Sequence, residues 1–145
     1  MSIDAGIHMT VEPGSSDWPV RFLNSLLSAG WEMNDHGKIV ILPLGDDDAF
    51  DWCEHRPETG DVWDVFRSKL EAEEPLGVAL TWQQTQSGGM FLFSPSGVVT
   101  FTPSINRRRL DDSDVSDVSW YLPKLLGAFS ISGTRLASWS WVETR

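Results

Sequence analysis

The sequence lacks the features that mark several large classes of protein. A single cysteine, Cys53, makes an intramolecular disulfide impossible, so nothing points to an oxidising compartment. No run of apolar residues approaches the roughly 18 that are needed to span a bilayer. The first residues have neither the basic start nor the apolar stretch of a secretory signal. We therefore expect a cytoplasmic protein.

Basic residues are also scarce. Eleven Lys and Arg residues against 21 Asp and Glu residues give a net charge of −10 and a pI near 4.5. Because phosphate contacts need clustered Lys and Arg, we expect no nucleic-acid partner, and anionic membranes are disfavoured for the same reason. The densest basic group, Arg107–Arg109, is followed by Asp111 and Asp112 and is interpreted as a self-neutralising surface loop.

Metal-binding patterns are incomplete. Cys53 and His55 lie two residues apart, but no second pair stands at the spacing of a zinc site. The acids that begin at Asp46 do not match a calcium loop, which needs glycine at position six and glutamate at position twelve. We therefore expect neither a metal nor another cofactor.

Only one histidine is well placed for catalysis. His8 and His36 fall in an expected tail and an expected turn, whereas His55 stands among acids. One alternative function is therefore a small hydrolase or lyase that uses His55 with Asp51 or Glu54. No motif for nucleophilic catalysis or nucleotide binding supports it, and we expect a protein that is not an enzyme.

The pattern of apolar residues predicts one α+β domain. The 41% hydrophobic and 22% charged residues are ordinary for a globular protein. Residues 1–16, rich in Gly, Ser and Pro, are expected to form a flexible lead-in, and residues 17–145 a single domain. A helix is predicted over Asp17–Ala29, where apolar side chains recur on one side and Gly30 follows.

The later segments alternate between strands and helices. Turn residues between two apolar runs predict a hairpin, and short turns between three further strands predict an antiparallel meander. A second helix ends before Pro75. The expected sheet is mainly antiparallel, made of the hairpin, the meander and a C-terminal strand, with about three helices packed on it. In chain order the segments are Trp31–Met33 and Lys38–Leu42 (hairpin), Asp61–Glu73 (helix), Leu76–Gln84, Met90–Phe93 and Val98–Thr102 (meander), Tyr121–Gly127 (helix) and Ser138–Val142 (strand, with Trp139 and Trp141 on one face).

The apolar sides of these segments predict a core. Its expected members are Phe22, Leu23, Leu26, Phe66, Leu70, Val78, Leu80, Phe91, Phe93 and Leu125.

Acidic residues are concentrated in one segment. Residues 46–74 hold eleven of the 21 acids against three bases, a net charge of −8. Solubility alone does not require such clustering, and tryptophan is enriched at binding hot spots. We therefore predict that this segment binds a basic protein partner. The expected contact residues are Asp46, Asp47, Asp48, Asp51, Trp52, Glu54, Asp61, Trp63 and Asp64.

In its small size, acidic stripe, many tryptophans and lack of catalytic motifs, the chain resembles the immunity proteins of polymorphic-toxin and contact-dependent growth-inhibition systems. The resemblance implies a small cytoplasmic protein that neutralises a cognate toxin domain. A basic, nuclease-like toxin would be blocked at its active cleft by an acidic surface. A second alternative is a structural or chaperone subunit of a phage or secretion particle, and the plainest interpretation of the acids is a solvated face.

Overall fold

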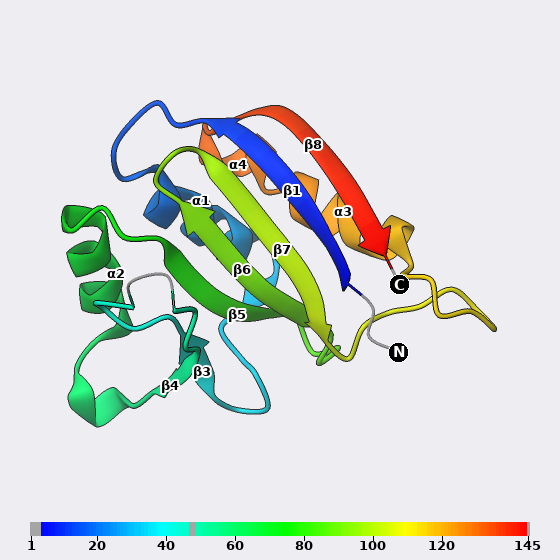
Figure 1. Ribbon diagram of the computed structural model, residues 1–145, viewed down its shortest axis with the longest axis horizontal. Coiled ribbons are helices and arrows are strands. Elements are labelled where there is room, and N and C mark those ends of the chain that lie inside the picture. The colour runs from blue at the N-terminus through cyan, green and yellow to red at the C-terminus, as the bar shows by residue number, and fades with distance from the viewer. Residues whose placement is uncertain (1–3, 47–48, 145) are drawn as a thin grey trace.

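The protein is an α+β fold built on one antiparallel sheet, as the sequence predicts. A computed structural model describes residues 4–46 and 49–144 (Figure 1). Within these residues eight strands form a single sheet in the order β4-β3-β5-β6-β7-β1-β8, and β2 pairs separately with β5. Every strand pair is antiparallel.

The predicted meander is confirmed as the middle of the sheet. It consists of β5 (Leu76–Trp82), β6 (Gly88–Ser94) and β7 (Val98–Ile105). Val78 pairs with Phe91, and Phe91 pairs with Phe101, so these three side chains share the face that packs on the helices. Short turns between consecutive strands produce this topology.

Residues 4–12 are not part of a flexible lead-in, contrary to the sequence-based expectation for residues 1–16. Residues Asp4–Glu12 form β1, a nine-residue strand that lies between β7 and the C-terminal strand β8 (Arg135–Thr144). Ile7 and Met9 are fully buried, whereas the alternate residues His8 and Thr10 are exposed. This period of two is typical of a strand with one face on the core. The globular domain therefore begins at β1.

The predicted hairpin over residues 31–42 is also wrong. The two apolar runs form β2 (Trp31–Glu32) and β3 (Ile39–Ile41), but both strands pair with β5 rather than with each other. The tight turn between them is closed by an isolated antiparallel bridge between Asp35 and Lys38. The turn residues therefore separate two short strands that pair with different parts of β5. A further strand, β4 (Cys53–His55), pairs with β3 and forms one end of the sheet.

Two predicted helices are confirmed and a third begins earlier than expected. These are α1 (Trp18–Ala29), α2 (Val62–Glu71) and α3 (Val118–Leu126), with a short α4 (Phe129–Ser132) and a 3-10 turn η1 (Pro57–Thr59). In Figure 1, α1, α3 and α4 lie behind the sheet, and α2 lies at the end formed by β3 and β4. No helix in residues 4–46 and 49–144 is long and apolar enough to cross a membrane.

The observed core matches the predicted core except on α2, where the buried face is shifted by one residue. Nine of the ten predicted residues are buried, but Leu70 is only half-buried. Its neighbour Lys69 is fully buried instead. At the centre, Trp31 makes an edge contact with Phe91 at 5.3 Å between ring centroids, and its indole N–H donates to the Lys124 carbonyl at 3.0 Å. A buried indole therefore has the partner it requires.

Candidate functional site

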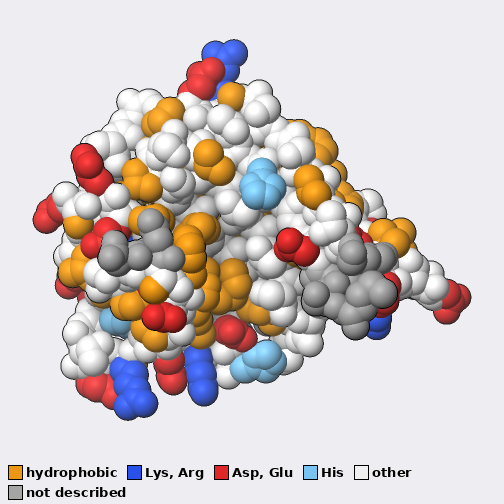
Figure 2. Space-filling view, viewed as in Figure 1, with side chains coloured by type: hydrophobic (Ala, Val, Ile, Leu, Met, Phe, Trp, Pro, Cys, Tyr) orange, Lys and Arg blue, Asp and Glu red, His pale blue; other side chains and the backbone are white. Residues whose placement is uncertain are grey.

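The acidic segment lies at one end of the sheet. It runs from the loop after β3 through β4 and η1 into α2. Figure 2 shows acidic side chains with hydrophobic ones between them on this side of the molecule. We call the described part of this region, residues 44–46 and 49–74, the acidic surface. Asp47 and Asp48, two of the predicted contact residues, lie outside the described residues.

Asp46 organises the loop at the start of the acidic surface. Its carboxylate accepts hydrogen bonds from the backbone N–H groups of Phe50 at 2.9 Å and Asp51 at 3.0 Å. Its backbone carbonyl accepts a third from Ala49 at 2.9 Å. Such short-range bonds are typical of an Asp that closes a tight loop. Asp46, one of the predicted contact residues, therefore holds Ala49, Phe50 and Asp51 in place by hydrogen bonds within the loop.

The loop presents two apolar side chains that the sequence analysis did not select. Phe50 is 47% exposed and Leu44 is 53% exposed. Phe50 has a φ of 55°, a left-handed conformation that a bulky residue rarely adopts. Such strain persists where surrounding contacts impose it, and it often marks a functional position. Here the Asp46 carboxylate supplies one of those contacts, through the Phe50 N–H.

A buried lysine fixes the loop to the end of α2. The Lys69 side chain is 1% exposed, and its ammonium group donates to the Pro43 carbonyl at 2.7 Å and lies 3.3 Å from a Glu74 carboxylate oxygen. The same oxygen accepts the Gly45 N–H at 2.8 Å. The hydrogen bond from Gly45 holds the pKa of Glu74 below its ordinary value. Burial acts in the opposite direction, and Lys69 lowers the pKa further. We call this group the lysine clamp: Lys69, Glu74, Pro43 and Gly45.

The two tryptophans of the predicted contact set are both half-buried. Trp52 packs over Gly77 on β5, where an added Cβ would come within 2.7 Å of the Trp52 ring and 2.5 Å of Leu42. Trp63 makes an edge contact with the buried Phe66 at 5.5 Å between ring centroids. Each indole is thus supported by the core on one side while part of it stays accessible, an arrangement suited to a rigid anchor.

The remaining acids of the predicted set are exposed, but they differ in their local partners. Asp61 caps α2 by accepting the Trp63 N–H at 3.1 Å. Asp64 forms an ion pair with Arg67 one turn later, and Glu54 lies 4.0 Å from Lys38. Ion pairs this exposed contribute little to stability and are readily exchanged for other partners.

The contacts of His55 do not favour the enzymatic alternative. Its Nε2 atom lies 2.8 Å from the Gly60 carbonyl. Because a carbonyl can only accept, this nitrogen bears the hydrogen and donates a hydrogen bond to the backbone. Glu54 is its neighbour on β4, and adjacent strand residues point to opposite faces, so Glu54 cannot orient the imidazole. A cavity of about 440 Å³ lined by His55, Ile39 and Val62 adjoins it. The free Cys53 is exposed.

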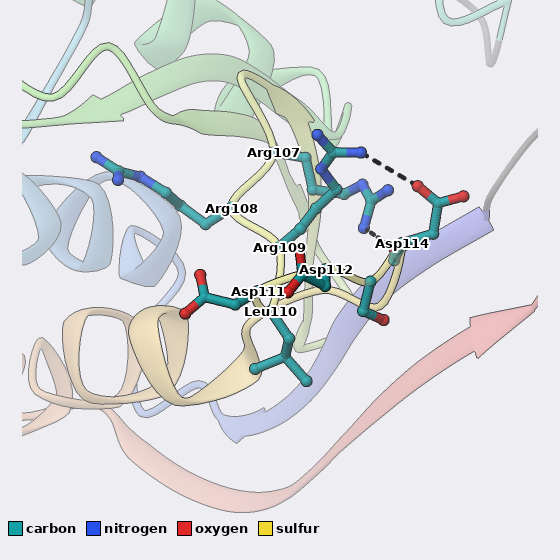
Figure 3. Close-up of a pocket in the computed structure, with 8 residues that line it drawn as sticks. Arg107, Arg108, Arg109, Leu110, Asp111, Asp112 and Asp114 are labelled. Atoms are coloured by element: carbon teal, nitrogen blue, oxygen red, sulfur yellow. Dashed lines mark hydrogen bonds and ion pairs between the residues drawn. The ribbon is translucent and has the colours of Figure 1, made fainter.

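Other polar clusters in the described part of the chain show no organised chemistry. Within it, no three His, Cys, Asp or Glu side chains come together in a way that could hold a metal ion. The hollow around Arg107–Asp114 is neutralised by its own residues, since Arg107 donates to the Asp114 carbonyl at 2.7 Å and Arg109 pairs with the Asp114 carboxylate at 3.2 Å (Figure 3). Arg108 points away from this pair and stacks over Trp120 at 5.0 Å.

The acidic surface therefore brings together rigid apolar side chains and exposed carboxylates at one end of the sheet. No protein-family model, no curated protein and no solved structure matches the chain.

Proposed function

We propose that the acidic surface binds a basic protein, and that the protein acts as an immunity protein which occludes the cleft of a nuclease-like toxin domain in the cytoplasm. One observation carries the proposal. Phe50 and Leu44 are exposed apolar side chains in a loop held by Asp46 and the lysine clamp, and exposed carboxylates lie in the same segment.

The two kinds of side chain support binding in different ways. Exposed acids such as Asp51 and Glu54 attract a positively charged partner and accelerate association. Apolar anchors are desolvated in the complex and slow its dissociation. Because the described loop residues on either side of positions 47 and 48 are held by the bonds of Asp46 and by the lysine clamp in the free protein, ordering these residues on binding would cost little conformational entropy.

The experiment begins with affinity capture from the native host, followed by kinetic measurements on the basic domain that is captured. Asp51→Lys should lower the association rate, and rising salt should remove most of the difference, because exposed charges are screened beyond about 8 Å at physiological ionic strength. Phe50→Ala should raise the dissociation rate about 30-fold, which corresponds to about 2 kcal/mol for a hot-spot residue.

A matched control is Ile131→Ala on α4, since Ile131 is 53% exposed but lies outside the acidic surface. It should leave both rates unchanged. A partner whose footprint lies away from residues 44–74, or equal effects of Phe50→Ala and Ile131→Ala, would contradict the proposal.

A further inference from the structure

Among residues 4–46 and 49–144, the strand at the other end of the sheet has an open edge. β8 is ten residues long and pairs with β1 on one side, and it is the last strand in the sheet order. In Figure 1 it lies at the outer margin of the sheet, opposite the end that holds β4 and α2. A long edge strand is a template for pairing with another strand, and proteins usually shorten or charge such edges. β4, by contrast, has three residues with Glu54 at its centre.

The hydrogen-bonding direction of β8 follows from its neighbour. The Val11 N–H donates a hydrogen bond at 2.9 Å to the carbonyl of Gly97, the residue before β7. The backbone N–H and C=O groups of Val11, Met9 and Ile7 therefore point toward β7. The backbone groups of the alternate residues of β1, such as His8, therefore point toward β8. On β8, Ser140 lies opposite His8. It follows that Ser140 directs its backbone groups to β1. Trp139 and Trp141 direct theirs outward, along the open edge.

Apolar side chains lie on both faces of this edge. Trp139 is 44% exposed on the helix side of the sheet, opposite the buried Met9. Val142 is 51% exposed on the other side. Trp141 is half-buried and its ring lies 5.5 Å from that of Tyr121. The edge thus combines outward backbone groups with apolar area that a second strand would cover.

We propose that β8 pairs antiparallel with β8 of a second copy of this chain, so that two sheets join into one across a two-fold axis. The charge distribution is compatible with a second copy as the partner. β8 carries one Arg and one Glu in its ten residues, whereas −8 of the net charge of −10 lies in residues 46–74. Six inter-strand spacings of about 4.8 Å separate β8 from β4, about 29 Å along the sheet. Each acidic surface thus lies farther from the proposed interface than the screening length of about 8 Å. Repulsion between the two acidic surfaces therefore does not oppose dimerisation.

The edge also specifies a register. The pairing of β1 with β8 shifts between Thr10 and Val11, which leaves Ala137 as an extra residue and makes residues 138–144 the regular part of the edge. Placing Ser140 on the two-fold axis sets each Trp139 opposite the second copy's Trp141, so that the exposed indole extends the aromatic pair with Tyr121. Shifting the axis to Trp141 would place Trp139 opposite Glu143, whose carboxylate is held by the Ser116 N–H at 3.1 Å.

The dimer is closed and leaves the acidic surface free. An isologous contact uses the same strand from both copies, and β4 is too short to continue the pairing at the far ends. The proposed function of the acidic surface and the pairing of β8 are therefore independent of each other.

Cysteine cross-linking tests the pairing and its register. In a Cys53→Ser background, Ser140→Cys should form an intermolecular disulfide under mild oxidation, because opposed residues outside the hydrogen-bonded pairs have Cα atoms about 4.5 Å apart. The control Ser138→Cys, on the same face two residues away, should not cross-link, because its two copies would be about 14 Å apart along the strands. Cross-linking at residue 138 as readily as at residue 140 would overturn the register.

Sedimentation of the intact chain tests the dimer itself. The mass should rise from 16.2 kDa towards twice that value as the concentration increases from micromolar to millimolar. Trp139→Lys should shift this transition to higher concentration at least tenfold. Leu44→Lys should not, because Leu44 is also an exposed apolar residue but lies in the acidic surface. A monomer at every concentration, or a dimer unaffected by Trp139→Lys, would overturn the proposal, as would a monomer whose β8 pairs only with a strand of another protein.

Discussion

Replacing Lys69 with methionine removes the ammonium group that joins the acidic loop to α2 while keeping a similar apolar stem. The lost contacts are the 2.7 Å hydrogen bond to the Pro43 carbonyl and the 3.3 Å ion pair with Glu74. The Glu74 side chain is 23% exposed, so its carboxylate would remain charged and partly desolvated without its cation. The substitution therefore removes the Lys69 hydrogen bond from the Pro43 carbonyl and leaves the Glu74 carboxylate without its cation.

The expected loss of stability can be bounded from this geometry. Breaking a fully buried ion pair by removing one partner costs about 3–5 kcal/mol. Because Glu74 retains some access to water and keeps the Gly45 N–H, we expect a value at the low end, about 2–3 kcal/mol. With a urea m value of about 2 kcal/mol per molar, the midpoint of unfolding should fall by about 1–1.5 M.

Urea unfolding followed by tryptophan fluorescence measures this change. Lys38→Met is the matched control, since the Lys38 side chain is 59% exposed and lies 4.0 Å from Glu54, and its loss should change stability by less than about 0.5 kcal/mol. The double variant Lys69→Met with Glu74→Gln should be less destabilised than Lys69→Met alone, because no unpaired carboxylate remains. If Lys69→Met and Lys38→Met unfold at the same midpoint, the lysine clamp does not hold the loop.

Two further predictions concern the core and acid pH. Leu26 is fully buried on α1, so Leu26→Ala should cost about 2–5 kcal/mol in the same unfolding assay, and a loss below about 1 kcal/mol would contradict the packing described. The pKa of Glu74 is lowered in the folded protein, so its contribution is complete above its ordinary value of 4.5 and is lost as the pH falls through the lower folded-state pKa. Melting temperatures between pH 6 and pH 3 should therefore fall more steeply for the wild-type protein than for Glu74→Gln, and parallel curves would refute this.

The sequence predicts the elements whose periodicity is local. The helix over Asp17–Ala29 and the three strands of the meander have caps, turns and apolar stripes within their own residues, so they are found without tertiary information. The strand β1 carries an equally regular alternation of buried and exposed residues. The Pro, Gly and Ser residues that follow it, at positions 13–16, nevertheless predict a flexible segment, because such residues are typical of loops.

Other features depend on contacts between distant segments. The hairpin between Trp31 and Leu42 fails because β5, more than 30 residues further along, pairs with both strands. Lys69 is buried rather than Leu70 because the Pro43 carbonyl, 26 residues away, accepts a hydrogen bond from its ammonium group. Likewise, Phe50 is exposed because of the conformation of the folded loop, and the composition of the segment does not predict this exposure. The charge of the candidate site and its two tryptophans could thus be predicted from the sequence, but the exposed Leu44 and Phe50 could not.

The position of β1 has a consequence for the order in which the protein folds. Ile7 pairs with Phe101 and with Trp141, 94 and 134 residues further along the chain. During synthesis, β1 therefore emerges with its apolar face unpaired and cannot complete its place in the sheet until both β7 and β8 have been translated. Such distant pairings are associated with slow folding and with exposure of unpaired strands to aggregation and chaperones. Asp4 and Thr144, opposite each other on β1 and β8, also lie close enough for a short linker, so a circular permutant that joins them would bring these two strands together early and should fold faster.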